Sequence, residues 1–229
     1  MIKMLFSSFY NTLIDEEEAI PTSTMLELDR VRGNGTFFCI LTNRSIEEIL
    51  YYNHDYPFID YIIAFNGGII YDVKKEQYLS RVFMKKEVLH KLNEEFSSFS
   101  CLYYTENGVS SSLPEEEVYK MEVSISKKDL KKIGSLDISY TVLEYQKNYS
   151  LEFSGGSFLE AIFWLLKKNE ISLDEVIGVV GNESDLSIVE HIDNTFVVSN
   201  ASRLLKKISR KKTKSNKNKG VEWVLKKYC

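Results

Sequence analysis

The strongest constraint on the fold of this 229-residue chain is an alternation of short apolar runs with stretches of helical spacing. The runs are rich in β-branched and aromatic residues and apolar on both faces, which is typical of buried strands in a parallel sheet. The alternation predicts a doubly wound, mostly parallel α/β sheet with helices on both faces. The expected strands are Lys3–Phe9, Thr36–Thr42, Tyr61–Phe65, Val176–Gly181 and Thr195–Val198.

The stretches between these runs predict crossover helices, several of which begin at a Ser or Asp that can cap the first turn. The expected helices are Ser23–Arg32, Ser45–Asn53, Ser157–Asn169, Asp185–His191, Ala201–Ser209 and Gly220–Lys227.

Residues 73–150 show a different pattern, in which exposed-looking strands surround two helical stretches. This pattern predicts a small inserted α+β cap domain, with residues 1–72 and 151–229 forming the core domain and a cleft between the two. Sites in open α/β sheets lie beyond the carboxyl ends of the strands, so the cleft is the expected site. The elements expected in the insert are strands Ser97–Tyr104, Val118–Ile125 and Ile138–Tyr145 and helices Lys85–Phe96 and Lys127–Ile133.

The composition, 44% hydrophobic and 27% charged with three prolines, is ordinary for a globular protein and excludes a disordered chain. No apolar run approaches the ~20 residues that span a bilayer, and the first residues lack a secretory cleavage pattern, so we expect a cytoplasmic protein without a membrane partner. Cys39, Cys101 and Cys229 are scattered without metal-ligand spacing, which predicts free thiols and no zinc.

Residues 203–219 carry nine Lys or Arg and no acidic residue. No aromatic residue that could stack on a base lies among them, so a solvated basic face is favoured over a nucleic-acid site. An interaction module that binds protein or nucleic acid through this surface stays an alternative, and the sequence names no protein partner.

Five segments in order resemble those of one enzyme family. KMLFSSFYNTLID and CILTNRS match two strand-end motifs, FNGGIIYD precedes the insert, and VIGVVGNESDLSIVEHI and NTFVVSNAS with TKSNKNKGV follow it. Together they are similar to the Cof-type phosphatases of the haloacid dehalogenase superfamily, and the resemblance covers essentially the whole chain. It implies that family's core fold with a cap.

The resemblance also implies a chemistry. The family uses an aspartate nucleophile on the first strand, a second aspartate two residues later as general acid/base, a Mg²⁺ ion and a supporting lysine. The nucleophile matches Ser8 and the acid/base matches Tyr10, so both carboxylates are replaced, whereas Thr12 is kept.

The other motifs are partly kept. In the phosphate-holding motif Thr42 is retained and is followed by Asn43 and Arg44, and Asn66 and Gly67 match the Asn-Gly segment before the cap.

The fourth motif and the lysine position are altered as well. Asn182 replaces the first acid of the fourth motif, and Asp185 is the retained acidic candidate for a metal, although capping of the helix that it begins is favoured. The lysine position matches Phe158 or one of its Ser and Gly neighbours. No cofactor is therefore expected, and Mg²⁺ only if family-type activity remains.

Ser8 and Asp15 are the two candidates for a substitute nucleophile. Ser8 would need an adjacent base, and His54, His90 and His191 lie at none of the strand ends. Asp15 belongs to the loop after the first motif. Neither is favoured.

The sequence therefore predicts a pseudoenzyme that binds a phosphorylated small molecule or another anion in the core–cap cleft through Ser8, Thr42 and backbone amides. A weak Mg²⁺-dependent sugar-phosphate phosphatase with a rearranged site is the enzymatic alternative.

Overall fold

The core domain is built on a mixed sheet, seen in a computed structural model that describes residues 1–14, 17, 19–54, 57–131, 133, 138–145 and 148–229. Neighbouring strands are parallel from β13 to β3 and antiparallel from β3 to β5. The predicted mostly parallel α/β sheet is confirmed. The strand order is β13 (Lys211–Thr213), β12 (Thr195–Val198), β11 (Val176–Val180), β1 (Met4–Ser8), β2 (Phe37–Leu41), β3 (Tyr61–Ala64), β4 (Ile69–Asp72) and β5 (Gln77–Arg81).

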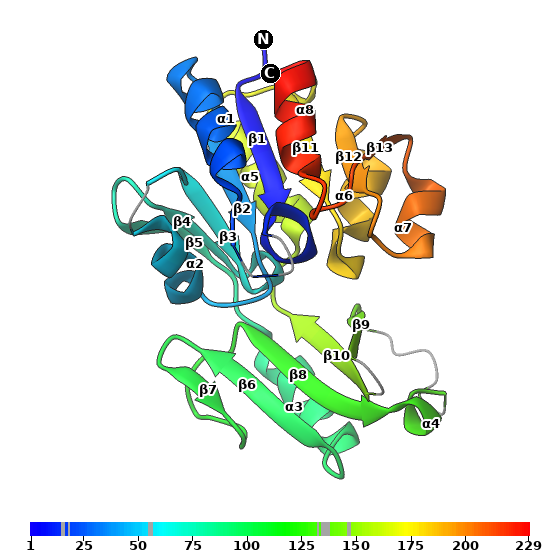
Figure 1. Ribbon diagram of the computed structural model, residues 1–229. Helices are drawn as coiled ribbons and strands as arrows, with labels where there is room; N and C mark the ends of the chain where they lie inside the picture. Colours follow the sequence, from blue (N-terminus) through cyan, green and yellow to red (C-terminus); the bar gives the residue numbers. More distant parts are fainter. Residues whose placement is uncertain (15–16, 18, 55–56, 132, 134–137, 146–147) are drawn as a thin grey trace.

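Helices cover both faces of this sheet (Figure 1). Helix α1 (Thr22–Gly33) packs against α8 (Gly220–Tyr228) in front of the sheet, and α5 (Phe158–Lys168) lies behind it. The remaining core helices are α2 (Ile46–Asn53), α6 (Leu186–His191) and α7 (Arg203–Ile208), with short turns η1 (Phe9–Leu13), η2 (Phe65–Gly67), η3 (Leu173–Glu175) and η4 (Glu183–Asp185).

Strand β1 lies in the middle of the sheet, and all five of its residues are therefore buried between the helical layers. Its neighbour β11 approaches closely at Gly178, where a Cβ atom would lie 2.2 Å from the ring of Phe6. A glycine is therefore required beside Phe6, and this packing brings the ends of β1 and β11 together at the site.

The cap domain is an antiparallel sheet with a helix on one face. Helix α3 (Lys86–Glu95) covers it, and Leu92 and Phe96 share a buried cluster with Phe153. The strand order is β7 (Gly108–Ser110), β6 (Ser100–Thr105), β8 (Lys120–Ser126), β10 (Asn148–Ser154) and β9 (Thr141–Tyr145), and α4 (Lys127–Leu130) follows β8.

The two sheets correct the expected boundaries of the insert. Strand β5 belongs to the core sheet, so the insert begins after Arg81 and not at residue 73. Strand β10 belongs to the cap sheet, so the core resumes after Ser154 and not at residue 151. The half-exposed pattern of β5 resembles a cap strand because β5 lies at the open edge of its sheet.

The two connections between core and cap run against each other. Gly67, with φ +101°, lies so close to the returning chain that a Cβ atom would be 2.2 Å from the carbonyl oxygen of Ser157. A Cβ atom on Gly155 would lie 2.3 Å from the backbone of Phe83 in the outgoing connection. Glycines at these points let both connections pass beside the strand ends. No helix in the described part of the chain is long and apolar enough to span a membrane.

Candidate functional site

Ser8, at the carboxyl end of β1, is hydrogen-bonded to Asp185, the acidic candidate of the expected fourth motif. Its Oγ donates to Oδ2 of Asp185 at 2.8 Å, and the same oxygen accepts from the backbone N–H groups of Gly181 (3.1 Å) and Asn182 (2.7 Å). Asp185 is completely buried, and its Oδ1 has no hydrogen-bond partner among the described residues. Burial raises the pKa of Asp185 to about 6, against the lowering effect of these three donors.

The expectation that Asp185 caps the helix that it begins is wrong for α6, although its side chain accepts from the N–H of Asn182 in the capping box at the start of η4. Its carboxylate accepts no hydrogen bond from the N–H groups of α6, because the η4 turn directs it back toward the ends of β1 and β11. Asp185 is a buried residue of the site.

Tyr10, which the resemblance matches to the family acid/base, extends toward α2. Its hydroxyl donates to Oε1 of Glu48, and the guanidinium carbon of Arg44 lies 4.8 Å from the centre of its ring. Arg44 also pairs with Glu48 at 3.2 Å. Burial and then the hydrogen bond to Glu48 raise the pKa of Tyr10, so its proton stays on the phenol at neutral pH.

Three asparagine amides cross-link the loops at this edge of the sheet. Asn182 Nδ2 donates to the carbonyl oxygen of Tyr10 at 3.1 Å, and Asn11 Nδ2 donates to Asn182 Oδ1 at 3.4 Å. Asn200 Nδ2, after β12, donates to the carbonyl oxygen of Asn11 at 2.8 Å. Sequence reasoning did not select Asn200, although it follows a predicted strand and lies at the same edge.

A cavity of about 480 Å³ lies above these loops. Seven of the predicted positions line it, namely Tyr10, Thr42, Asn43, Arg44, Phe158, Asn182 and Asp185. The cap contributes Leu143 and Glu144 of β9, so the cavity lies between the two domains, as expected of the cleft.

Three of the other four predicted positions lie behind or beside the cavity, and the fourth, Asn66, bonds to the cap. Ser8 is 1% exposed and Thr12 Oγ1 is buried without a partner among the described residues. Gly67 serves the crossing of the two connections. These three residues shape the site without lining the cavity.

A buried polar cluster joins the core to the cap. Asn43 and Asn66 each donate to the carboxylate of Glu152 on β10 at 3.0 Å, and Lys120 Nζ on β8 lies 2.6 Å from the same carboxylate. Lys120 and Glu152 are each 2% exposed. Sequence reasoning missed both, although each is a charged residue inside a strand with alternating apolar positions.

The residues present do not fit Mg²⁺ as the family resemblance implies it. Asp185 offers one carboxylate oxygen, but no cluster of three His, Cys, Asp or Glu that could hold a metal occurs in the described ranges. The amide of Asn182 directs its N–H toward the carbonyl of Tyr10, and such donors oppose a cation.

The histidines and cysteines considered in the sequence analysis do not line the cavity. His191 bonds to the carbonyl of Ser187 within α6, His54 follows α2, and His90 is in α3 of the cap. Cys39, Cys101 and Cys229 are free. Asp15 lies outside the described residues.

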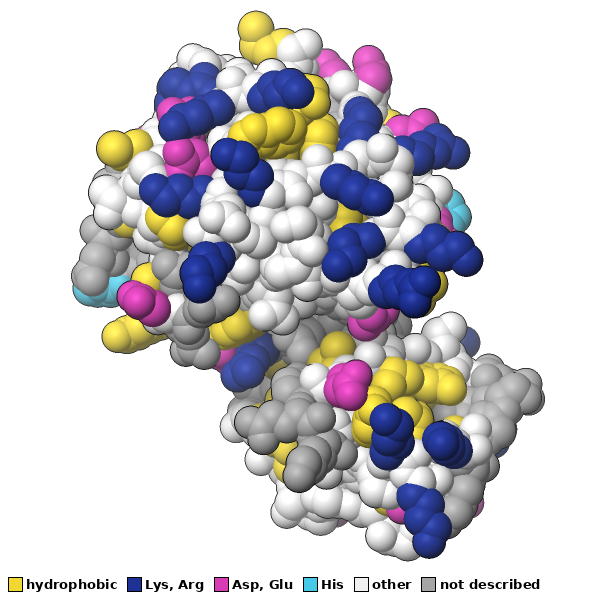
Figure 2. All heavy atoms as spheres, turned by 45° about the vertical axis from the view of Figure 1, so that its right-hand side comes forward, with side chains coloured by type: hydrophobic (Ala, Val, Ile, Leu, Met, Phe, Trp, Pro, Cys, Tyr) yellow, Lys and Arg dark blue, Asp and Glu magenta, His cyan; other side chains and the backbone are white. Residues whose placement is uncertain are grey.

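The basic segment 203–219 forms α7, β13 and the loop before α8, at the edge of the core sheet. Figure 2 shows the Lys and Arg side chains of this side spread singly over the surface and not gathered around a hollow. Arg210 pairs with Asp193, and Lys211 donates to Asn194, so part of this charge is held locally.

Comparison with known proteins places this chain in a family. The model of the haloacid dehalogenase-like hydrolases matches residues 6–148 and 154–225. The chain belongs to this hydrolase family. The resemblance found in the motifs is thereby confirmed.

Relatives of this hydrolase-family chain cover its full length. A Haemophilus influenzae protein named "Putative phosphatase" is 24% identical over 98% of this chain and 97% of its own length. A Streptococcus pyogenes protein with the name "Putative phosphatase M6_Spy0533" is also 24% identical, over 99% and 98%.

Solved structures of this hydrolase family share the fold. A haloacid dehalogenase-like hydrolase from B. subtilis superposes with a TM-score of 0.88 at 15% identity, covering 100% of both chains. A sugar phosphatase of subclass IIB superposes with a TM-score of 0.81 at 19% identity, covering 98% of each.

Proposed function

We propose that this chain is a phosphatase-family protein that binds a phosphorylated small molecule or another anion in the core–cap cleft without hydrolysing it through a covalent aspartyl phosphate. The observation that carries this proposal is the hydrogen bond from Ser8 Oγ to the buried Asp185. It occupies the place where the family resemblance implies the aspartate nucleophile.

Ser8 is a poor substitute nucleophile. Asp185 could accept its proton, but the hydroxyl is buried and does not line the cavity, so a phosphoryl group in the cavity cannot reach it without rearrangement. A nucleophile must be within contact of the reacting atom.

Tyr10 is a poor substitute for the acid/base. Its proton is directed to Glu48, and its raised pKa disfavours transfer at neutral pH. The covalent chemistry of the family therefore lacks both a nucleophile and an acid/base in position.

Anion binding is supported by the donors that remain at the cavity. Thr42 and the partly exposed guanidinium of Arg44 face it, and the backbone N–H of Asn43 follows the end of β2. Asp185 opposes an anion when it is ionised, so we expect binding to strengthen as the pH falls through about 6.

Calorimetric titration with sulfate and a panel of sugar phosphates tests this proposal. We expect binding that weakens about fivefold in Arg44→Ala, since hydrogen-bonded charge contributes about 1 kcal/mol or more at such a site. Lys207→Ala, which removes an exposed charge on α7, is the matched control. Absence of binding to the wild type, or equal loss in both variants, would refute the proposal.

A weak Mg²⁺-dependent phosphatase is the second candidate, and Oδ1 of Asp185, which has no hydrogen-bond partner within the described ranges, favours it. Such an activity would disappear in Asp185→Asn and require added Mg²⁺, and phosphate release measured with and without the metal distinguishes the two candidates.

A further inference from the structure

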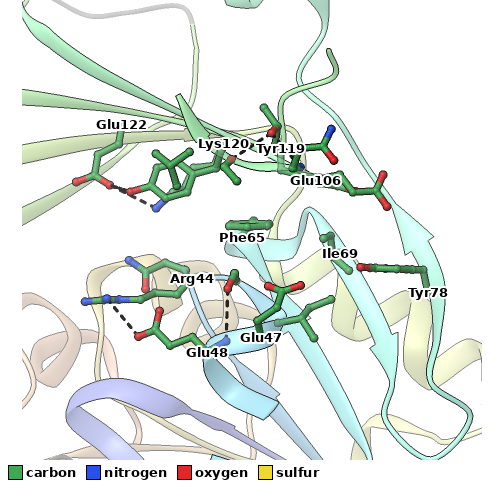
Figure 3. Close-up of a pocket in the computed structure, with 18 residues that line it drawn as sticks. Arg44, Glu47, Glu48, Phe65, Ile69, Tyr78, Glu106, Tyr119, Lys120 and Glu122 are labelled. Atoms are coloured by element: carbon green, nitrogen blue, oxygen red, sulfur yellow. Dashed lines mark hydrogen bonds and ion pairs between the residues drawn. The ribbon is translucent and has the colours of Figure 1, made fainter. Parts of the chain in front are cut away.

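A second cavity, of about 780 Å³, lies between the core and the cap beside the first. The two share Asn43 and Arg44, and the second is bounded by the first turn of α2 below and by the β6–β7 hairpin and β8 above (Figure 3). Its volume is within the range of sites for small organic molecules.

Aromatic side chains form much of its wall. The ring of Phe65 stacks on that of Tyr119, with centres 5.4 Å apart and planes at 14°, and lies 5.9 Å from the ring of Tyr104. Tyr78 and Ile69 continue this surface on the core side. A flat apolar body can pack here.

The charge of the lining is negative. The carboxylates of Glu47, Glu48, Glu106 and Glu122 face the cavity with two cationic groups, those of Arg44 and Lys120, which leaves a net charge of −2.

Both cationic groups already have partners. Arg44 pairs with Glu48, and Lys120 lies 2.6 Å from Glu152 and 3.6 Å from Glu122. Glu106 in turn pairs with Arg81 at 2.9 Å. Among the four lining carboxylates, it is therefore Glu47 that offers a bound cation uncompensated charge.

Glu47 is the carboxylate most available to a ligand. It has no hydrogen bond or ion pair within the part of the chain that the structure describes, and Figure 3 shows its carboxylate directed into the space below Phe65. Its neighbour Glu48 is engaged by Tyr10 and Arg44.

Tyr119 supplies an independent indication of a ligand. The residue is fully buried in the cavity wall, and its hydroxyl has no hydrogen-bond partner among the described residues. Buried polar groups are rarely left unpaired, so a polar group of a bound molecule is a natural partner.

We propose that the second cavity binds an organic cation with a flat apolar body, its ammonium group beside Glu47 and its body against Phe65 and Tyr104. This site adjoins the anion site of the proposed function and shares Asn43 and Arg44 with it, but its proposed contacts, Glu47, Phe65 and Tyr104, do not line the anion site. Aromatic faces also attract cations, which reinforces the preference set by the carboxylates.

Three indole probes that share a flat body and differ in charge test this inference: tryptamine (cationic), tryptophol (neutral) and indole-3-acetate (anionic). Calorimetry and ligand-observed NMR at pH 7 should show binding in that order, with tryptamine about threefold or more tighter than tryptophol, as expected for one exposed charge pair. Equal binding of the three probes, stronger binding of the anion, or no binding of tryptamine would overturn the inference.

The variant Glu47→Gln tests whether the ammonium group of tryptamine binds beside Glu47. Because Glu47 is exposed, the variant should fold normally, bind tryptamine about threefold more weakly and lose the preference over tryptophol. Glu95→Gln, which removes an exposed carboxylate of the cap helix α3, is the matched control and should leave both affinities unchanged. An equal effect of the two variants would show attraction by overall charge and refute the assignment to Glu47.

Discussion

At the scale of single residues, the site depends on how one buried acid is held. The carboxylate of Asp185 receives hydrogen bonds from Ser8, Gly181 and Asn182 on one oxygen while burial opposes its ionisation. Asp185 thus takes part in the packing of the strand ends.

Asp185 should make the protein less stable as the pH rises. Its pKa is about 6 in the folded protein and near 3.8 in the unfolded chain, so the folded state binds the proton more tightly. This stabilisation is complete below about pH 4 and is lost as the pH rises through 6, at a cost of roughly 3 kcal/mol. Asp185→Asn should not show this loss, and urea unfolding of both proteins from pH 4 to 8 measures it.

The difference in free energy of unfolding between Asp185→Asn and the wild type isolates this one group, because the other titrating groups cancel. It should increase in favour of the variant between pH 4 and 7. A constant difference would mean that Asp185 ionises normally.

Tyr119 gives a second prediction at this scale. Its hydroxyl is buried without a partner in the part of the chain that the structure describes, so Tyr119→Phe should raise the free energy of unfolding by about 1 kcal/mol. Chemical denaturation measures the change, with Tyr103→Phe as control. The Tyr103 hydroxyl donates to Asn93, and its loss should destabilise the protein. Destabilisation by both variants would contradict the conclusion that the Tyr119 hydroxyl makes no stabilising hydrogen bond.

At the scale of elements, the two domains are joined by a charged cluster and by glycines. Lys120 and Glu152 lie on neighbouring cap strands, and Glu152 receives the amides of Asn43 and Asn66 from the core. Cap strands and core loops therefore share one buried polar unit.

Breaking that unit should be costly. Lys120→Met removes the cation and leaves Glu152 charged and buried, which costs about 3 kcal/mol or more. Adding Glu152→Gln should restore part of this stability because the buried charge is then gone. Equilibrium unfolding of the single and double variants tests the coupling, and a neutral Lys120→Met would disprove it.

The crossing of the connections gives a matched glycine pair. Gly67→Ala meets both a positive φ and the Ser157 carbonyl, so we expect a loss of about 2 kcal/mol or more. Gly35, with φ +88°, has open space around it, and Gly35→Ala should cost only about 1 kcal/mol. Thermal unfolding of the two variants compares them, and equal losses would mean that the close contact relaxes freely.

At the scale of the whole molecule, the parallel part of the fold was predictable because each central strand is an apolar run with a clear boundary. The edges were not. Strand β13 is a basic three-residue segment, and β5 is half-exposed. Strand β10 belongs to the cap sheet although it ends at Ser154, shortly before core helix α5 begins at Phe158.

The candidate site was predictable at the strand ends, where motif and topology coincide. The site residues that other elements contribute were not predictable from the sequence, because their positions depend on tertiary contacts. Glu152 and Lys120 meet the core only after the cap has folded over it, and Glu48 meets Tyr10 only because α2 follows β2 at the same edge.

The most direct test of the proposed loss of covalent catalysis is turnover of p-nitrophenyl phosphate and a panel of sugar phosphates, with and without Mg²⁺. The wild type should release no phosphate above background, and the double variant Ser8→Asp, Tyr10→Asp should gain measurable Mg²⁺-dependent activity. Wild-type activity that needs Mg²⁺ and survives Ser8→Ala would contradict both the assignment of the site and the proposed binding function.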